Sequence, residues 1–353
     1  MKSKNQGSLE YLLLIGGAVI VAAIVISLII SASQEAAKNV KDNLPVSASD
    51  EIKILKTQDL KDFLHLAVGN SLIRDDGISS KNYPEFWAVS EQRVAANMVM
   101  RGIAENEETV VERGWKAIEY GFTKQKPDGS FYYNPILDSR GITEEDKLED
   151  ASFFLEAAGH SISLLQNSGF KNDYAEKIQL LEPKIELSLD WLEANKEALK
   201  LKAANAPNRL VFDALAFSLN GRKAVGEEFI QEALSKQHSQ GYFIEHGGFD
   251  SSYNAVSILK LELYQLYFPS SQIENAIKES MAWEKTRILP SGEVNVEGNT
   301  RTGSCQEQVL GECKQVDYPS VALSFHYYAK MFNDPESLEF AEKITDYAVN
   351  NLR

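Results

Sequence analysis

A long apolar stretch lies near the N-terminal end of the sequence. From Tyr11 to Ile30 it contains no charged residue. About 20 apolar residues in a helix suffice to cross the hydrocarbon core of a bilayer, and a soluble helix of that length would carry a polar face. Lys2 and Lys4 precede the stretch, which favours a cytoplasmic N-terminus. We therefore expect residues 11–32 to anchor the chain in the cell membrane, with the C-terminal part outside the cell.

Helix-forming residues continue beyond the apolar stretch to Asn43. Leu44 and Pro45, followed by small residues, then break the helical pattern. The sequence thus predicts a transmembrane and stalk helix over residues 6–43 and a hinge or linker over residues 44–58. One extracellular domain is expected over residues 59–353.

Beyond residue 85 the apolar positions follow helical spacing, and no alternating strand pattern of useful length interrupts them. The predicted helices come in pairs, of which the first is richly apolar and the second amphipathic: 86–104 with 107–123, 146–167 with 174–201, 209–220 with 227–238, 251–268 with 272–288, and 318–331 with 336–352. The connecting loops 126–134, 239–250 and 289–299 each carry a glycine followed by an apolar or aromatic residue. This repeat predicts an all-α fold, an incomplete α/α toroid of about five helical hairpins. A TPR- or HEAT-type solenoid is the alternative.

Charge and cysteine content narrow the classes of partner. The net charge is −15, and an acidic surface disfavours nucleic acid and anionic membrane surfaces. It counts only mildly against a polyanionic substrate, because a local basic cleft can override the average. Cys305 and Cys313 lie in one loop, and outside the cell we expect them to form a disulfide. No cysteine or histidine cluster accompanies them, so we expect neither a metal nor a cofactor.

The residues around the start of the apolar stretch follow the motif Q-x-S-x-E-x-x-x-L, carried by Gln6, Ser8, Glu10 and Leu14. This pattern resembles the class III signal peptide of archaeal type IV pilin-like proteins. The resemblance implies that a class III signal peptidase cuts after Asn5 and removes residues 1–5 as a leader. It also implies that Glu10, costly at a membrane boundary, pairs with the N-terminal amine of a neighbouring pilin-like subunit. An ordinary signal anchor is the alternative.

A second resemblance covers residues 208–261. An Asn-Arg pair opens a predicted helix, a glycine-rich loop carries an aromatic residue and a histidine, and a tyrosine follows: Asn208, Arg209, His246 and Tyr253. This order resembles the catalytic region of α/α-toroid polysaccharide lyases of the chondroitin AC and hyaluronate type. The family's later arginine loop would correspond to GNTRTG, with Arg301. His160 stands where the family has an asparagine, and the spacing from His246 to Tyr253 is shorter than in the family.

The resemblance implies β-elimination on uronic-acid polysaccharides. Arg301 and His160 would neutralise the substrate carboxylate. Tyr253, with a pKa lowered by His246 and Arg301, would act as base and acid. Further expected substrate-binding residues are Asn208, Arg209, Trp87 and Glu245. Hydrolysis would instead need two carboxylates, for which the sequence offers Glu156, Asp213, Glu245 and Asp250.

Each candidate side chain also has a structural interpretation. His160 is typical of a core histidine, Tyr253 of packing at a helix start, and Arg301 of a solvated loop. Three classes of function therefore stay open. The first is a surface protein that binds polysaccharide and in one version cleaves it; the second is a structural pilin-like subunit or adhesin without activity. The third is a helical-repeat scaffold that binds proteins.

Overall fold

The computed structural model describes residues 48–83, 86–135, 143–303, 305–309 and 312–351. These residues belong to one compact unit, residues 45–353. The predicted membrane and stalk helix over residues 6–43 lies outside the described residues, and so do Asn5, Gln6, Ser8 and Glu10. No helix within the described ranges combines the length and apolar character that a bilayer crossing requires.

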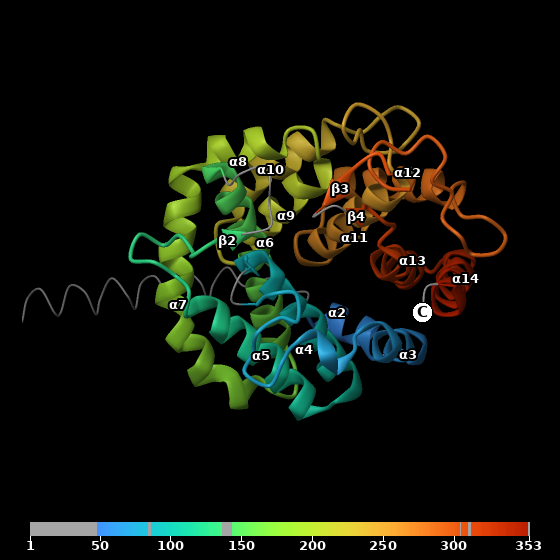
Figure 1. Ribbon diagram of the computed structural model, residues 1–353. Helices are drawn as coiled ribbons and strands as arrows, with labels where there is room; N and C mark the ends of the chain where they lie inside the picture. The colour runs from blue at the N-terminus through green and yellow to red at the C-terminus, as the bar shows by residue number, and fades with distance from the viewer. Residues whose placement is uncertain (1–47, 84–85, 136–142, 304, 310–311, 352–353) are drawn as a thin grey trace, which may run out of the picture. The chain divides into compact units, whose positions relative to one another are not determined.

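The described unit is mostly helical, which confirms the predicted all-α class (Figure 1). Its helices follow one another in pairs: α2 (Ala48–Leu55) and α3 (Gln58–Ala67), α4 (Val94–Glu105) and α5 (Glu108–Phe122), α6 (Glu144–Asn167) and α7 (Lys171–Ala194), α9 (Pro207–Ser218) and α10 (Lys223–Leu234), α11 (Ser251–Tyr267) and α12 (Ser271–Lys285), and α13 (Tyr318–Phe332) and α14 (Pro335–Asn351). A short helix, α8 (Lys196–Ala203), follows α7, and the 3-10 turns are η1 (Asn70–Leu72) and η2 (Val89–Arg93). Two short antiparallel ladders join β1 (Phe86–Trp87) to β2 (Asn134–Pro135) and β3 (Gln308–Val309) to β4 (Glu312–Cys313).

The first helices of successive pairs pack against one another. Helix α4 contacts α6, α6 contacts α9, α9 contacts α11, and α11 contacts α13, while each second helix packs on its own partner. The burial pattern follows from this arrangement. Helix α6 is buried almost continuously over its central turns, whereas α12 buries a single stripe that includes Ile273, Ile277 and Met281.

Helix α2 occupies residues that the sequence pattern assigned to a linker. It packs on α4, α6 and α11, and its residue Glu51 is fully buried. The Glu51 carboxylate accepts hydrogen bonds from His160 Nε2 at 2.8 Å, Tyr267 Oη at 2.7 Å and Tyr327 Oη at 2.7 Å. Residues 48–55 are therefore part of the helical domain, and the predicted linker over residues 44–58 is wrong for this segment.

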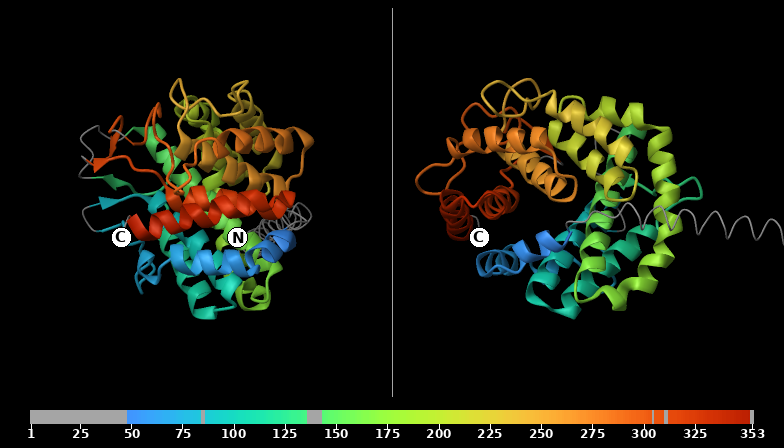
Figure 2. Two further views of the ribbon diagram at one scale, coloured as in Figure 1. Left: turned by 90° about the vertical axis from the view of Figure 1, so that its right-hand side faces the viewer. Right: turned by 180° about the vertical axis from the view of Figure 1, so that it is seen from behind.

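Four glycine turns recur along the chain, one more than the sequence pattern revealed. Each glycine has a positive φ, and a Cβ at any of them would collide with a backbone carbonyl of a later outer helix. The pairs are Gly77 with Lys116, Gly129 with Leu187, Gly241 with Glu279, and Gly292 with Lys343. The turn at Gly77 follows α3, so the α2–α3 pair belongs to the same repeat series. In Figure 2 this first pair and the last helix, α14, lie side by side.

Candidate functional site

The structure brings several predicted site residues together at the start of α11. Asp250 caps this helix, because its Oδ1 accepts a hydrogen bond from Tyr253 N at 3.1 Å. Its Oδ2 also accepts from the backbone N–H groups of Arg301, at 2.9 Å, and Thr302, at 2.7 Å. One fully buried carboxylate thus fixes the arginine loop to the start of α11 and places Arg301 beside Tyr253.

Five side chains form what we name the Arg301 cluster: Glu245, Tyr253, Arg301, Glu307 and Lys314. The Arg301 guanidinium pairs with Glu245 on one side and with Glu307 on the other, where Nε lies 2.6 Å from Oε2. Its Cζ lies 4.0 Å from the centroid of the Tyr253 ring, within the range of a cation–π contact. Arg301 is 1% exposed, so it is a buried, paired side chain and not the solvated loop residue of the structural interpretation.

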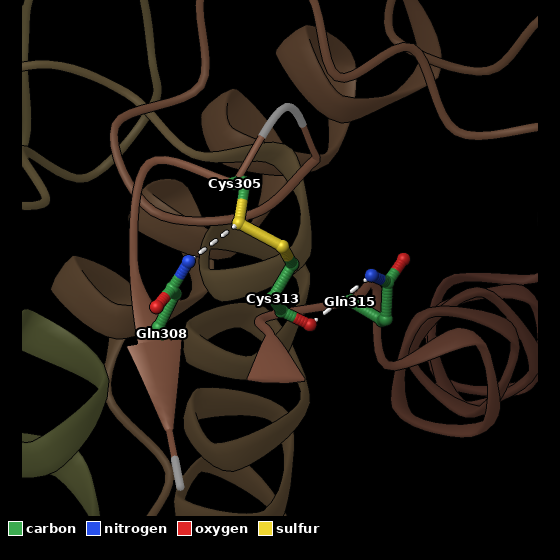
Figure 3. The surroundings of a disulfide bond; sticks show 4 residues. All are labelled: Cys305, Gln308, Cys313 and Gln315. Carbon is green, nitrogen blue, oxygen red and sulfur yellow. Dashed lines mark hydrogen bonds between the residues drawn. A yellow bond between two sulfur atoms is a disulfide. The ribbon is translucent and has the colours of Figure 1, made fainter. Parts of the chain in front are cut away.

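Glu307 and Lys314 complete the cluster from the segment that contains β3 and β4. Lys314 Nζ lies 3.0 Å from Glu307 Oε1 and 4.9 Å from the Tyr253 ring centroid. Burial opposes the charged form of Glu307, but hydrogen bonds from Arg301 and Lys314 prevail and lower its pKa to about 2. The predicted disulfide between Cys305 and Cys313 is confirmed, and it closes the loop that carries Glu307 (Figure 3).

The surroundings of Tyr253 do not lower its pKa. Burial raises the pKa of Tyr253, and Arg301 offsets this only in part; the predicted lowering of this pKa is wrong. Burial, followed by the charge of Arg301, lowers the pKa of His246. His246 itself has a φ of 51°, and its backbone N–H donates to Asn205 O at 2.9 Å. The tyrosine is therefore held as a neutral phenol.

The carboxylates considered for hydrolysis each have a protein partner. Asp213 accepts a hydrogen bond of 2.5 Å from Ser152 Oγ, and burial raises its pKa well above the ordinary value. Glu156 pairs with Lys260 at 2.8 Å. Glu245 pairs with Arg301, and Asp250 caps α11. These contacts give each of the four carboxylates a structural role that accounts for its position.

A second group of residues, which sequence reasoning missed, lies on η2 and on the first helices α6, α9 and α11. We name it the aromatic–cation strip: Arg93, Phe153, Phe212 and Lys260. The Phe153 and Phe212 rings are 4.7 Å apart. Arg93 lies 5.5 Å from the Phe153 ring and Lys260 lies 4.4 Å from the Phe212 ring. All members of the strip are partly exposed. In the sequence they look like ordinary helix positions, and no motif distinguishes them.

Arg209 is near both of these groups. It begins the face of α9 that continues to Phe212, and its NH1 lies 2.9 Å from Glu149 Oε1. Its charge acts on Tyr253 and on Lys314, so it is close to the Arg301 cluster as well. Helical spacing on α11 supports the same continuity, since Tyr253 and Lys260 lie two turns apart on one partly exposed face.

The remaining predicted residues lie elsewhere. His160 is 3% exposed and bonds to Glu51 in the core. Trp87 is also buried and packs 5.6 Å from the Tyr120 ring, with Lys124 over its face. Asn208 precedes Arg209 but is buried at the start of α9. His160 and Trp87 thus make their contacts away from the Arg301 cluster. The described residues contain no His, Cys, Asp and Glu group that could hold a metal ion.

Comparison with known proteins concerns the N-terminal part of the chain. A family model, the class III signal peptide, matches residues 3–29. This range contains the motif and most of the apolar stretch, so the predicted class III signal peptide is confirmed. A class III signal peptide indicates processing by the class III signal peptidase and a pilin-like protein at the membrane or cell surface. No curated protein matches the chain.

Proposed function

We propose that the chain is a pilin-like cell-surface protein whose helical domain binds carboxylate-bearing polysaccharide without cleaving it. The class III signal peptide supports the surface location. The finer parts of the proposal are cleavage after Asn5, membrane anchoring through residues 11–32, a stalk over residues 6–43, and pairing of Glu10 with a neighbouring subunit. The helical domain would then be displayed outside the cell.

The proposal includes an α/α toroid. The pair α2 and α3 is added to the five expected hairpins as a sixth, and it lies between the first of them, α4–α5, and the last, α13–α14. Three contacts between α3 and α13 support this closure. Lys330 Nζ lies 2.9 Å from Asp59 Oδ1, His326 Nδ1 lies 3.5 Å from Asp59 Oδ2, and the Phe63 and His326 rings are 5.0 Å apart. In this arrangement the first helices form an inner ring, and the aromatic–cation strip lies on that ring.

The observation that carries the binding proposal is the aromatic–cation strip. An aromatic ring offers an apolar face for a sugar ring, and arginine and lysine pair with carboxylates. The nearby carboxylate of Asp150 does little to offset the cations below neutral pH, because burial raises its pKa to about 8. Lys260 is paired with Glu156 at 2.8 Å, so the preference of the strip for an anionic saccharide over a neutral one rests on Arg93.

Binding is favoured over elimination by the state of the predicted catalytic groups. Arg301 is occupied by two carboxylates, and His160 is occupied by Glu51. The pKa of Tyr253 is raised, which makes the phenol a poorer base at neutral pH. We therefore expect no absorbance from unsaturated uronate products when the protein is incubated with polygalacturonate, alginate or hyaluronate. Product formation that is lost in Tyr253→Phe would contradict the non-cleaving part of the proposal.

The binding proposal is tested with the full chain in detergent micelles and immobilised polygalacturonate. Phe212→Ala is expected to weaken retention at least about 5-fold, since stacking on an aromatic ring contributes on the order of 1 kcal/mol. Phe340→Ala is the matched control, because Phe340 is a partly exposed phenylalanine on the outer helix α14. Equal retention of both variants would refute the role of the strip.

The same measurements separate the other classes of function. If the wild type is not retained by any acidic polysaccharide but copurifies with filaments, the structural subunit or adhesin replaces the binding protein. If it instead captures a defined protein partner and no filament, the scaffold is favoured.

A further inference from the structure

One of the two carboxylates in the Arg301 cluster reaches solvent. The two cations of the cluster, Arg301 and Lys314, face two carboxylates, Glu245 and Glu307. The Glu245 side chain is 2% exposed and contacts the guanidinium from the buried side, where burial, offset only in part by Arg301, raises its pKa to about 7. The Glu307 side chain is 23% exposed. Glu307 is therefore the partner of Arg301 that lies on the solvent side of the cluster.

The contacts of Glu307 are those of a bound carboxylate. Arg301 donates to it through Nε at 2.6 Å and NH2 at 3.2 Å, which is a bidentate fork. Lys314 Nζ adds a third donor at 3.0 Å. Both cations also lie over the Tyr253 ring. A carboxylate flanked by an arginine fork, an ammonium group and an aromatic ring is the environment that an acidic sugar would require.

We propose that Arg301 and Lys314 form a subsite for the carboxylate of an acidic saccharide, and that Glu307 occupies this subsite as an internal competitor. The inference rests on the proposed function and adds to it the chemical class of the group recognised and a means of regulation. An incoming saccharide carboxylate takes the place of the Glu307 carboxylate on the two cations, and Glu307 moves into solvent.

The segment that carries Glu307 is held by two constraints. The Cys305–Cys313 disulfide closes its loop, and the Lys314 N–H donates to Glu307 O at 2.9 Å. The disulfide is surrounded by polar side chains: Gln308 Nε2 lies 3.2 Å from Cys305 Sγ, and Gln315 Nε2 donates to Cys313 O at 3.1 Å (Figure 3). Reduction to two thiols breaks the sulfur–sulfur bond, with the two electrons supplied by a phosphine or dithiol. It releases the loop and weakens the internal competitor.

The decisive variant is Glu307→Gln, because the amide keeps the shape of the side chain and removes its charge. Glu312→Gln is the matched control: it removes the same charge from an exposed position of the same loop. Binding of tetragalacturonate to the full chain in micelles is measured by calorimetry, with neutral cellotetraose as the comparison ligand. We expect Glu307→Gln to bind tetragalacturonate roughly 10-fold more tightly, the factor given by loss of about 1.4 kcal/mol of competition.

Three further outcomes complete the test. Adding Lys314→Met to Glu307→Gln is expected to cancel the gain, and wild type treated with a phosphine reductant is expected to gain affinity where Glu307→Gln does not. An equal gain in Glu307→Gln and Glu312→Gln would overturn the inference, since net charge alone would then explain it. If wild type binds polygalacturonate and neither Glu307→Gln nor reduction changes the affinity, the inference fails and the proposed function stands. If no form binds an acidic saccharide, both fail.

Discussion

Removal of the Glu51 carboxylate is the sharpest test of how the domain is held together. Glu51 belongs to α2 and accepts hydrogen bonds from α6, α11 and α13 through His160, Tyr267 and Tyr327. The carboxylate is fully buried, and so are both phenols. In Glu51→Ala these donors lose their acceptor in a place that the fold shields from water.

The size of the effect follows from the three donors. A buried polar group left without a partner costs about 1–3 kcal/mol, so three of them cost about 3–9 kcal/mol. Relief of the burial cost of the carboxylate itself reduces this sum. We therefore expect a loss of about 3–5 kcal/mol, the range found when one partner of a buried charged network is removed. A domain with a stability of about 5–15 kcal/mol would lose a large part of it.

The loss is measured by urea denaturation of the full chain in micelles, followed by circular dichroism at pH 7. Glu197→Ala is the control, because the Glu197 side chain is 79% exposed and pairs only with Lys200 on its own helix; a change below about 0.5 kcal/mol is expected there. The structure also predicts a pH dependence. Burial opposes ionisation of Glu51, but His160 and the two phenols prevail and lower its pKa.

The stability from Glu51 is therefore present above the ordinary glutamate pKa and is lost as the pH falls through the lowered one. Wild type should lose this contribution on acidification, and Glu51→Ala should not. If Glu51→Ala has the same free energy of unfolding as Glu197→Ala, the reasoning is refuted, because α2 would then be held by apolar contacts alone.

Three further predictions concern other parts of the chain. Burial raises the pKa of Glu284 to about 8, so the folded protein resists ionisation of this carboxyl. Wild type should therefore lose up to about 4 kcal/mol of stability through this group as the pH rises from 4.5 to 8. Urea midpoints at the two pH values should show a smaller loss in Glu284→Gln. Gly241→Ala should lower the free energy of unfolding by at least about 2 kcal/mol, because φ is 101° and the new Cβ meets a carbonyl of α12. Gly247→Ala, which has open space around its Cβ, should lower it by about 1 kcal/mol in the same denaturation assay. Gln6→Ala should prevent removal of the leader, and Glu10→Ala should leave the cut intact but reduce recovery in filaments; N-terminal sequencing of the mature protein and filament purification check both, and normal filaments from Glu10→Ala would contradict the assembly role.

Local sequence alone determined the features that depend on spacing along the chain. The class III motif is read by a peptidase as a linear segment, so Gln6, Ser8 and Glu10 sufficed to identify it. The helix pairs were also predictable, because one-sided burial imposes the 3.6-residue period on each outer helix. Glycines such as Gly129 and Gly241 predicted the positions of their turns, since only glycine avoids a clash with the carbonyl of the later helix.

The tertiary structure decided which polar groups are free to act. Sequence placed Arg301, Tyr253 and Glu245 in one region, and the structure does bring them together. It also gives Arg301 a second partner, Glu307, from the cysteine loop, to which the sequence pattern assigned no role beyond the disulfide. His160 was predicted to face substrate and instead bonds to Glu51 on a helix more than a hundred residues earlier.

The same limit explains the segment over residues 48–55 and the aromatic–cation strip. A short helix such as α2 is too brief for its apolar period to stand out, and it is stable because three other helices bury it. Phe153 and Phe212 have the sequence appearance of core residues, and only the packing of α6 on α9 leaves them partly exposed beside cations. Pairing and exposure depend on contacts between distant segments, and a linear pattern carries no record of which segments will meet.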